Sequence, residues 1–304
     1  MMVLSFEESR AQAQLLAEQL QVTHGQVEVH RFPDGESRVK VPSPLPPTVL
    51  FYLSLDHPNQ KLIELILAVA ASRSQGCERA ILVAPYLCYM RQDMEFEPGQ
   101  AVSQRIIGEL LSSRLEGVIT VDPHLHRIND LSESFIHCPS VSLPAAGVIG
   151  HYLGAQWQRD GTGNIRRGIL VGPDEESEQW VRAAADTSGL PFCIARKERF
   201  GDRDVRVVLP DQDFEGRHAI LLDDVISSGH TIQQAAIALR AAGCTQVDAA
   251  CTHALFAAGA TEALQQAGVS RIISCNSIPH PTNCIDLSPL LATAARNMKG
   301  GHMA

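Results

Sequence analysis

Residues 220–231, ILLDDVISSGHT, combine residue types that can bind a phosphorylated sugar. An apolar run ends in two carboxylates, Asp223 and Asp224, which can accept hydrogen bonds from sugar hydroxyls. A turn of small residues then opens a helix pattern, and its glycine and hydroxyl groups let backbone N–H groups converge on an anion. A plain strand, turn and capped helix would explain neither the double aspartate nor the run of small residues. The predicted phosphate-binding residues are Ser227, Ser228, Gly229, His230 and Thr231.

Two cations, Lys197 and Arg199, follow another apolar run and belong to the polar stretch RKERFGDRD, where Gly201 gives the backbone freedom. Residues two apart on an extended segment point to the same side, so both cations can face one phosphoryl group. Positive charge placed there stabilises the charge that develops in phosphoryl transfer. We therefore expect a catalytic lid here. The alternative is an exposed basic loop that binds nothing.

His124 and Asp174 each follow an apolar run, one in each half of the chain. Both positions lie at the carboxyl ends of predicted strands, where open α/β sheets bind their ligands. The functional interpretation is a shared Mg2+ that bridges bound phosphates, with Asp122 orienting His124 or binding the metal through water. The alternative is a histidine and an aspartate in solvated loops.

The elements that must position these residues are short β-branched runs, which alternate with amphipathic stretches. This alternation predicts an α/β fold, with parallel sheets covered by helices on both faces. The predicted strands are 27–32, 49–55, 80–87, 117–122, 168–174, 192–196, 219–225, 246–255 and 271–278. The predicted helices include 61–74, 102–114, 178–187 and 231–242.

The order of elements repeats, because each half contains an apolar run that ends in acidic residues, ITVDPH in the first and ILLDDV in the second. We therefore expect two similar α/β domains rather than one large sheet. The stretch PSVSLPAAG, residues 139–147, is rich in proline, serine and glycine and lies near the midpoint, which is typical of a boundary. The predicted domains are 1–145 and 146–285.

Composition excludes several classes of function. The 304 residues carry 25 Lys and Arg against 34 Asp and Glu, a formal net charge of -9, which argues against nonspecific nucleic-acid binding. Charged residues interrupt the N-terminal apolar run before it could cross a bilayer or form a signal peptide, so we expect no membrane partner. The eight cysteines are dispersed without a C-x-x-C pair, which predicts buried, reduced thiols in a cytoplasmic protein.

Residues 220–231 closely resemble the phosphoribosyl-diphosphate loop of type I phosphoribosyltransferases and of ribose-phosphate pyrophosphokinases. Other segments separate these families, because they resemble the pyrophosphokinases and occur in the expected order from about residue 29 to residue 292. They are RFPDGE (31–36), PYLCYMRQD (85–93), VDPH (121–124), VGPD (171–174), the K-x-R of 197–199 and NSIPHPTNCIDLSPLLA (276–292). The resemblance is closest to the shorter, archaeal-type branch of the pyrophosphokinases.

The resemblance implies two tandem phosphoribosyltransferase-like, Rossmann-like domains with parallel sheets, and residues 286–304 packing back on the first domain. The first domain would bind ATP and the second ribose 5-phosphate. The implied enzyme is a ribose-phosphate diphosphokinase, which transfers the diphosphoryl group of Mg-ATP to the C1 hydroxyl of ribose 5-phosphate and releases AMP. Lys197 and Arg199 would be its catalytic residues. Members of this family assemble as dimers or larger oligomers, so we expect a homo-oligomer.

The resemblance also assigns the ATP site. Phe32, Asp34 and Glu36 lie on a Pro-Asp-Gly turn, and the resemblance implies that Phe32 stacks on adenine while the carboxylates hold its amino group or the ribose. In relatives this turn reaches the site of an adjacent subunit. Arg91 and Gln92 are expected to contact ATP, because an arginine there can pair with phosphate or stack on adenine. The alternatives are a simple hairpin and a surface ion pair.

Two departures from the family keep other functions open. Residues 175–177 are Glu-Glu-Ser where the family usually has a glycine-bearing turn, and the sugar-phosphate loop has Ser227, Ser228 and His230 where the family often has Asp or Ser, Thr and Gly. One alternative is a phosphoribosyltransferase, which would not need RFPDGE, RQD or K-x-R. The other is a catalytically impaired regulatory homologue, which residues 175–177 favour and the retained Lys197 and Arg199 oppose.

Overall fold

The computed structural model describes residues 1–125, 127, 130–159, 167–199 and 205–299. The chain divides into two compact units. Unit 1 contains Met1–Leu143, Ser277–Pro279 and the stretch from Leu287 onward, and unit 2 contains Pro144–Asn276 and His280–Asp286. The first break between the units thus follows residue 143, two residues before the boundary that the sequence predicted after residue 145.

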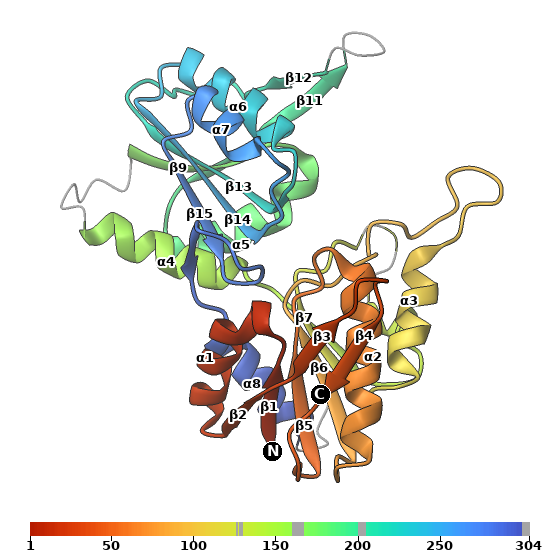
Figure 1. Ribbon diagram of the computed structural model, residues 1–304. Coiled ribbons are helices and arrows are strands. Elements are labelled where there is room, and N and C mark those ends of the chain that lie inside the picture. The colour runs from red at the N-terminus through yellow and green to blue at the C-terminus, as the bar shows by residue number, and fades with distance from the viewer. Residues whose placement is uncertain (126, 128–129, 160–166, 200–204, 300–304) are drawn as a thin grey trace. The chain divides into compact units, whose positions relative to one another are not determined.

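Unit 1 is built on a six-stranded parallel sheet of order β2-β1-β5-β6-β7-β8. The central strands are mostly apolar and are buried except for Arg79, as expected when helices cover both faces of a parallel sheet (Figure 1). The strands are β1 Met2–Ser5, β2 Thr23–Gln26, β5 Thr48–Tyr52, β6 Arg79–Ala84, β7 Gly117–Val121 and β8 Ser140–Leu143. The helices are η1 Glu7–Ser9, α1 Arg10–Leu20, α2 Pro58–Arg73, α3 Ser103–Ser112, η2 Leu131–Glu133 and α8 Ser288–Lys299.

Unit 2 contains a second six-stranded parallel sheet, of order β10-β9-β13-β14-β15-β16. Numbered within its own sheet, each unit has the same strand order, 2-1-3-4-5-6, and this confirms the predicted pair of similar parallel α/β sheets. The strands are β9 Gly168–Gly172, β10 Phe192–Ile194, β13 His218–Ile226, β14 Gln246–Ala254, β15 Arg271–Cys275 and β16 Asn283–Ile285. The helices are α4 Ala146–Arg159, η4 Glu175–Ser177, α5 Glu178–Ser188, α6 His230–Ala241 and α7 Ala260–Gln266.

One sequence prediction about unit 1 was wrong, and another was incomplete. Residues 139–147 contain the break between the units, after Leu143, but they also contain β8, which pairs with β7 and was not predicted as a strand. An edge strand is half-exposed, so its composition is similar to that of a linker. Residues 27–32 were predicted as a sheet strand, but β3 Glu28–Arg31 pairs antiparallel with β4 Ser37–Lys40 in a separate hairpin. Only alternate residues of this hairpin face the core, a pattern of one-sided burial.

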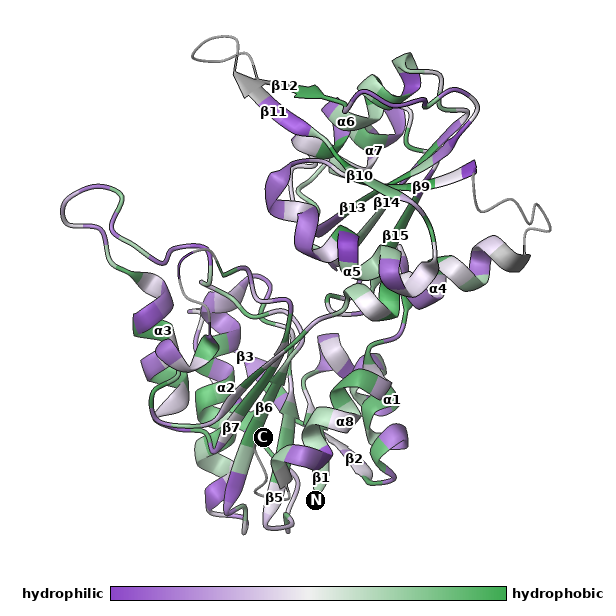
Figure 2. Cartoon of the chain, turned by 180° about the vertical axis from the view of Figure 1, so that it is seen from behind, coloured by the Kyte–Doolittle hydropathy of each residue, from purple (hydrophilic) through white to green (hydrophobic). Residues whose placement is uncertain are grey.

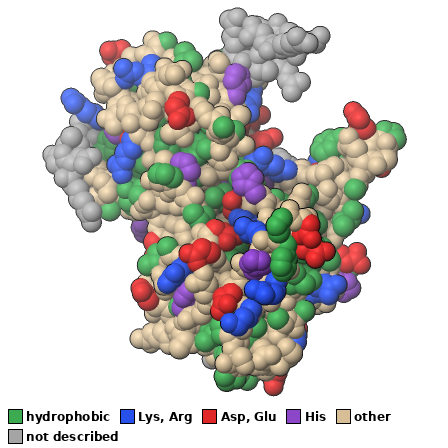
Figure 3. All heavy atoms as spheres, in the orientation of Figure 1, with side chains coloured by type: hydrophobic (Ala, Val, Ile, Leu, Met, Phe, Trp, Pro, Cys, Tyr) green, Lys and Arg blue, Asp and Glu red, His purple; other side chains and the backbone are tan. Residues whose placement is uncertain are grey.

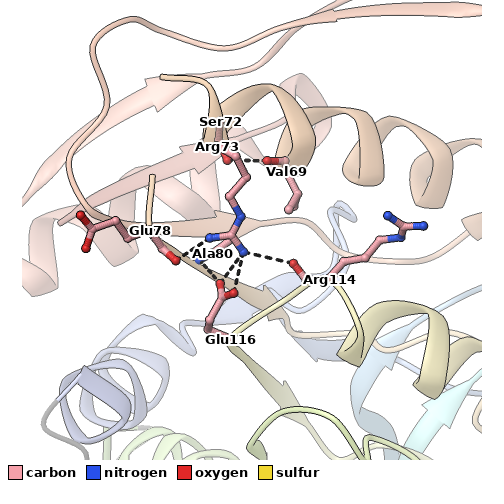
Figure 4. Close-up of polar contacts among 7 residues, drawn as sticks. All are labelled: Val69, Ser72, Arg73, Glu78, Ala80, Arg114 and Glu116. Carbon is pink, nitrogen blue, oxygen red and sulfur yellow. Dashed lines mark hydrogen bonds and ion pairs between the residues drawn. The ribbon is translucent and has the colours of Figure 1, made fainter. Parts of the chain in front are cut away.

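An ion-pair network joins three elements at the amino-terminal edge of the first sheet (Figure 4). Arg73, at the end of α2, donates to both carboxylate oxygens of Glu116 at 2.7 and 2.6 Å, and to the carbonyl oxygens of Glu78 and Arg114. Glu116 also accepts the backbone N–H of Ala80 at 2.6 Å. One guanidinium thus donates hydrogen bonds to residues that directly precede β6 and to residues that directly precede β7. It therefore fixes where both strands begin.

Helix α8 packs against α1 and β7, so unit 1 contains segments from both ends of the described chain. Arg296 donates to the carbonyl of Gln19, and Arg79 donates to the carbonyl of Met298 at 3.1 Å. Close approach to β7 depends on Gly117, where a Cβ atom would lie 2.4 Å from the Met298 sulfur. The apolar face of α8 is therefore part of the core of unit 1.

All eight cysteines are free, and seven are buried, while Cys284 is exposed. Burial raises the pKa of Cys88 to about 12 and that of Cys193 to about 11, so these groups stay protonated and unreactive at neutral pH.

In Figure 2 the strands of both sheets carry hydrophobic colouring along much of their length. Among the described helices, none combines the length and apolar character that a bilayer crossing requires.

The packing of α8 leads to a prediction. Leu291 is fully buried on α8, so Leu291→Ala should destabilise unit 1 by about 2–5 kcal/mol through lost burial and a cavity. Hydrogen exchange should accelerate in α1 and β7 and stay unchanged in β13 and β14. The matched control is Leu239→Ala on α6, also fully buried, which should reverse this pattern. Equal acceleration in both units by Leu291→Ala would contradict the assignment of α8 to unit 1.

Candidate active site

The predicted sugar-phosphate loop lies between β13 and α6, at the carboxyl end of the second sheet. Gly229 has φ 72°, a left-handed conformation that favours glycine, and it is the N-cap of α6. Since glycine offers no capping side chain, the first backbone N–H groups of the helix can serve an anion. Ser228 and His230 are exposed beside it, while Ser227 and Thr231 are half-buried. The backbone N–H of Ala257 donates to the carbonyl of Ser227 at 3.1 Å and holds the loop.

The two loop aspartates differ in burial. Asp224 is 2% exposed and accepts the backbone N–H of Val225 at 2.7 Å, whereas Asp223 is partly exposed and accepts the N–H of Asp224 at 3.0 Å. Burial raises the pKa of Asp223 well above its ordinary value, and the negative charges of Asp224 and Asp174 raise it further. The carboxylates predicted for sugar and for metal therefore act on one another within unit 2.

Asp174 follows β9 and begins the acidic turn that departs from the family pattern. Residues Glu175–Ser177 form a short 3-10 helix, η4, whose N-cap is Asp174. The Asp174 carboxylate accepts the N–H of Ser177 at 3.3 Å, and the Ser177 hydroxyl donates to the Asp174 carbonyl at 2.6 Å. Asp174 thus caps the glycine-free turn, and its two hydrogen bonds with Ser177 hold it in place.

The predicted catalytic residues lie on an antiparallel ribbon, β11 Arg196–Arg199 with β12 Val205–Val208, and β12 lies beside α6 (Figure 1). Lys197 Nζ lies 2.6 Å from Oδ2 of Asp174, so a predicted catalytic cation is paired with a predicted metal ligand. Arg199 is the last residue of β11, and its backbone pairs with Val205 in the ladder. Gly201, to which the sequence assigned the freedom of the lid, lies outside the described residues.

The predicted adenine-binding residues lie at the tip of the β3–β4 hairpin in unit 1. Phe32 is 40% exposed and its ring lies edge-on to that of His30, 4.7 Å between centroids. The tip is closed by a hydrogen bond from Phe32 N to Glu36 O at 2.8 Å, and Asp34 accepts the N–H of Glu36 at 3.1 Å. Phe32, Asp34 and Glu36 are therefore all exposed to solvent at the tip of one hairpin. A hairpin is also what the alternative interpretation of this segment predicted, so the backbone alone does not distinguish the two interpretations.

Arg91 and Gln92 follow β6 in a loop at the carboxyl end of the first sheet. Arg91 is exposed, and the Gln92 side chain accepts the Ser103 hydroxyl at 2.8 Å, which ties the loop to α3. The neighbouring Asp93 has a fully buried side chain and accepts Arg127 at 2.6 Å. Sequence reasoning missed this pair, because nothing in the sequence links residue 93 to residue 127.

His124 follows β7 in the same unit and is half-buried, after Asp122 with φ 36°. Asp174 belongs to unit 2, so the sharing of one metal by His124 and Asp174 stays a prediction. Within the described ranges, no three His, Cys, Asp or Glu side chains form a metal-binding cluster. Mg2+ is commonly held by one or two carboxylates, water and substrate phosphates rather than by an all-protein cage. The mutually repelling Asp174 and Asp223 supply carboxylates of this kind.

The convergence of carboxylates gives a pH-dependent prediction. Because the pKa of Asp223 is raised in the folded protein, its contribution to stability is complete below the ordinary value of 3.8 and is lost as pH rises through the folded pKa. Asp223→Asn should therefore raise Tm at pH 8 in EDTA, at about 2–4 °C per kcal/mol, and should give no gain near pH 3.5. The exposed Asp211→Asn is the control. A pH-independent gain would contradict the electrostatic origin.

Comparison with known proteins bears on both units. The family model described as the N-terminal domain of ribose phosphate pyrophosphokinase matches residues 1–114. The model described as the phosphoribosyl transferase domain matches residues 151–290. The two matches agree with the family that the sequence motifs indicated.

Relatives and a solved structure extend the match along the whole chain. The ribose-phosphate pyrophosphokinase of Methanopyrus kandleri is 34% identical over 301 residues, which are 99% of this chain and 100% of the relative. That of Thermococcus kodakarensis is 32% identical over 266 residues, 88% of this chain and 90% of the relative. The phosphoribosylpyrophosphate synthetase of Mycobacterium smegmatis has the same fold, with a TM-score of 0.80 over 99% of both chains at 24% identity. The chain therefore belongs to the ribose-phosphate pyrophosphokinase family.

Proposed function

We propose that the chain is a ribose-phosphate diphosphokinase, which transfers the β,γ-diphosphoryl group of ATP to the C1 hydroxyl of ribose 5-phosphate and yields 5-phosphoribosyl 1-diphosphate and AMP. The observation that carries the proposal is the loop between β13 and α6, in which Gly229 caps the helix without a side chain, in a chain that matches pyrophosphokinases along its whole length. A transferase would account for the loop alone. It would not account for the match of residues 1–114 to the N-terminal pyrophosphokinase model.

Ribose 5-phosphate binds unit 2 in this proposal. The 5-phosphate lies at the start of α6, where it accepts backbone N–H groups and the hydroxyls of the loop serines and Thr231. Asp223 and Asp224 accept hydrogen bonds from the ribose hydroxyls, which orients the C1 hydroxyl for attack. The burial of Asp224 and the hydrogen bond from the Val225 N–H support this role, because they hold its carboxylate in one position before the sugar arrives.

ATP binds through unit 1. Phe32 stacks on adenine, Asp34 and Glu36 accept from its amino group or the ribose, and Arg91 and Gln92 contact the nucleotide. The exposure of the hairpin tip supports this assignment, because an aromatic ring there is open to a base.

His124 and Asp174 are the residues proposed to hold Mg2+. When bound, the metal screens the triphosphate charge and fixes its geometry. Asp174 pairs with Lys197 in the structure, so a cation already occupies one carboxylate oxygen that the metal would use. Lys197 would be available to the phosphates once this ion pair opens.

Lys197 and Arg199 are the proposed catalytic residues. The ribose C1 hydroxyl oxygen attacks the β-phosphorus of ATP and gives up its proton to water, a new P–O bond forms, and the bond to the AMP oxygen breaks. Negative charge develops on the β-phosphoryl oxygens and on the leaving AMP oxygen, and both cations stabilise it from the β11 strand. Their positions two residues apart on that strand support a common target.

Further parts of the proposal concern partners and location. We propose a homo-oligomer, a dimer or larger, in the cytoplasm, with small-molecule substrates. On the face drawn in Figure 3, basic, acidic and histidine side chains are interspersed, and neither positive nor negative side chains dominate this face. Together with the net charge of -9, this supports a site for small phosphorylated ligands rather than for nucleic acid.

One assay tests the function. With ATP, Mg2+ and ribose 5-phosphate the protein should release AMP, and without the sugar it should release none, because the C1 hydroxyl is the acceptor. AMP can be measured by chromatography. Pyrophosphate release from phosphoribosyl diphosphate and a base would indicate a transferase instead. Binding of both substrates without turnover would indicate the catalytically impaired homologue, which residues 175–177 favour.

The lid assignment gives a second test. Lys197→Ala should lower kcat on the order of 10³-fold, as loss of a transition-state cation does, and leave both KM values within about threefold. Arg199→Ala should behave alike. The matched control is Arg196→Ala on the same strand, an exposed residue 3.8 Å from Glu175, which should keep kcat within about twofold. A near-normal kcat for Lys197→Ala would remove the catalytic assignment.

A further inference from the structure

Glu64 on α2 is a charged residue in the middle of a buried helix face. Its side chain is 1% exposed, and it accepts three hydrogen bonds from the β3–β4 hairpin. Arg31 donates through Nε at 2.8 Å and through Nη2 at 3.0 Å, and the Ser37 hydroxyl donates at 2.8 Å. One carboxylate of α2 thus binds both strands of the hairpin.

The two donors occupy a particular rung of the hairpin. Arg31 and Ser37 are paired in the β3–β4 ladder, and theirs is the last pair before the tip. Toward the base, Val29 and Val39 pack against the core of unit 1. Residues 32–36, beyond this rung, are all exposed. Glu64 is therefore bound where the packed part of the hairpin ends and the exposed tip begins.

Open space borders the hairpin near its tip. A cavity of about 650 Å³ is lined by Gly35, Glu36, Ser37, Gln60, Ile63 and Leu67, which come from the hairpin and from α2. A second cavity, of about 440 Å³, is lined by Glu7, Glu8, Gln26, Val27, Glu28, Val29 and Arg31. The first of these spaces lies between the tip and α2, so apolar packing against α2 does little to fix the tip. The hydrogen bonds to Glu64 restrict it instead.

The charge state of Glu64 agrees with this geometry. Burial alone would raise the pKa of Glu64, but hydrogen bonds from Arg31 and Ser37 and the charges of Arg31 and Lys61 lower it overall. The hydrogen bond to Glu64 raises the pKa of Arg31. Both groups are therefore ionised at neutral pH. Removing either charge leaves its partner poorly compensated, which is costly for a buried carboxylate.

We propose that Glu64 is the positioning residue of the hairpin tip, and that through Arg31 and Ser37 it sets the affinity of the protein for the adenine nucleotide. The inference rests on the proposed function, which assigns Phe32, Asp34 and Glu36 to ATP. A tip held in one position before binding loses less conformational freedom when the ligand arrives, so its affinity is higher. Glu64 itself touches no substrate in this account.

The test compares Glu64→Gln with Glu28→Gln. The isosteric Glu64→Gln removes the buried charge, whereas Glu28→Gln removes an exposed ion pair with Lys40 at the other end of the same hairpin. Glu64→Gln should raise the KM and the Kd for ATP by roughly tenfold, within the coupling range of contacting residues, and leave kcat and the KM for ribose 5-phosphate within about twofold. Hydrogen exchange at residues 32–36 should accelerate. Glu28→Gln should change none of these values.

A second variant covers the case in which Glu64→Gln fails to fold. Ser37→Ala leaves the ion pair intact and should weaken ATP binding in the same direction by a smaller factor. If wild-type protein binds ATP and Glu64→Gln binds it equally tightly, the positioning role is refuted while the proposed function stands. Equal losses in kcat and in both KM values would also refute it, because they would reflect general instability. Failure of the wild type to bind ATP would refute the proposed function itself.

Discussion

Burial of both faces of each parallel sheet is the constraint on which the rest of the structure depends. The strands β7 and β9 are buried along their whole length and β6 is buried after Arg79, and among their buried side chains only that of Thr120 is polar. Chemistry can then occur only where strands end, and parallel strands all end at one edge. The loops after β9 and β13 thus meet at one edge of the second sheet, and the loops after β6 and β7 meet at one edge of the first.

A buried carboxylate has an electrostatic cost, and the two units compensate it differently. In unit 2, Asp223 is left with its pKa raised by burial and by neighbouring carboxylates, and a single exposed lysine compensates Asp174. In unit 1, the buried carboxylate of Glu64 has three hydrogen bonds and a bidentate partner. The carboxylates of unit 2 therefore favour the binding of a further cation, whereas the charge of Glu64 in unit 1 is already compensated by its partners.

Sequence patterns predicted those features that depend on local chemistry. The continuous apolar runs revealed the buried strands, and the double aspartate followed by a small-residue turn revealed the β13–α6 loop, whose glycine has the positive φ that such a turn requires. The edge strand β8 was missed because half-burial weakens its apolar pattern. Glu64 and the pair of Asp93 with Arg127 were missed for another reason. Each depends on contacts between residues about 30 positions apart, so a charged residue that is buried has the same local sequence as one that is solvated.

The return of α8 to unit 1 has a consequence for synthesis on the ribosome. Unit 1 contains the first strand of the chain, yet α8, which supplies part of its core, leaves the exit tunnel only after all of unit 2. Until α8 emerges, the surface of the first sheet that α8 covers remains exposed to water. By that time all strands and helices of unit 2 have been synthesised. The unit that is translated first is thus the last to be completed, and during that interval its uncovered apolar surface is the part of the nascent chain most exposed to chaperones and to aggregation.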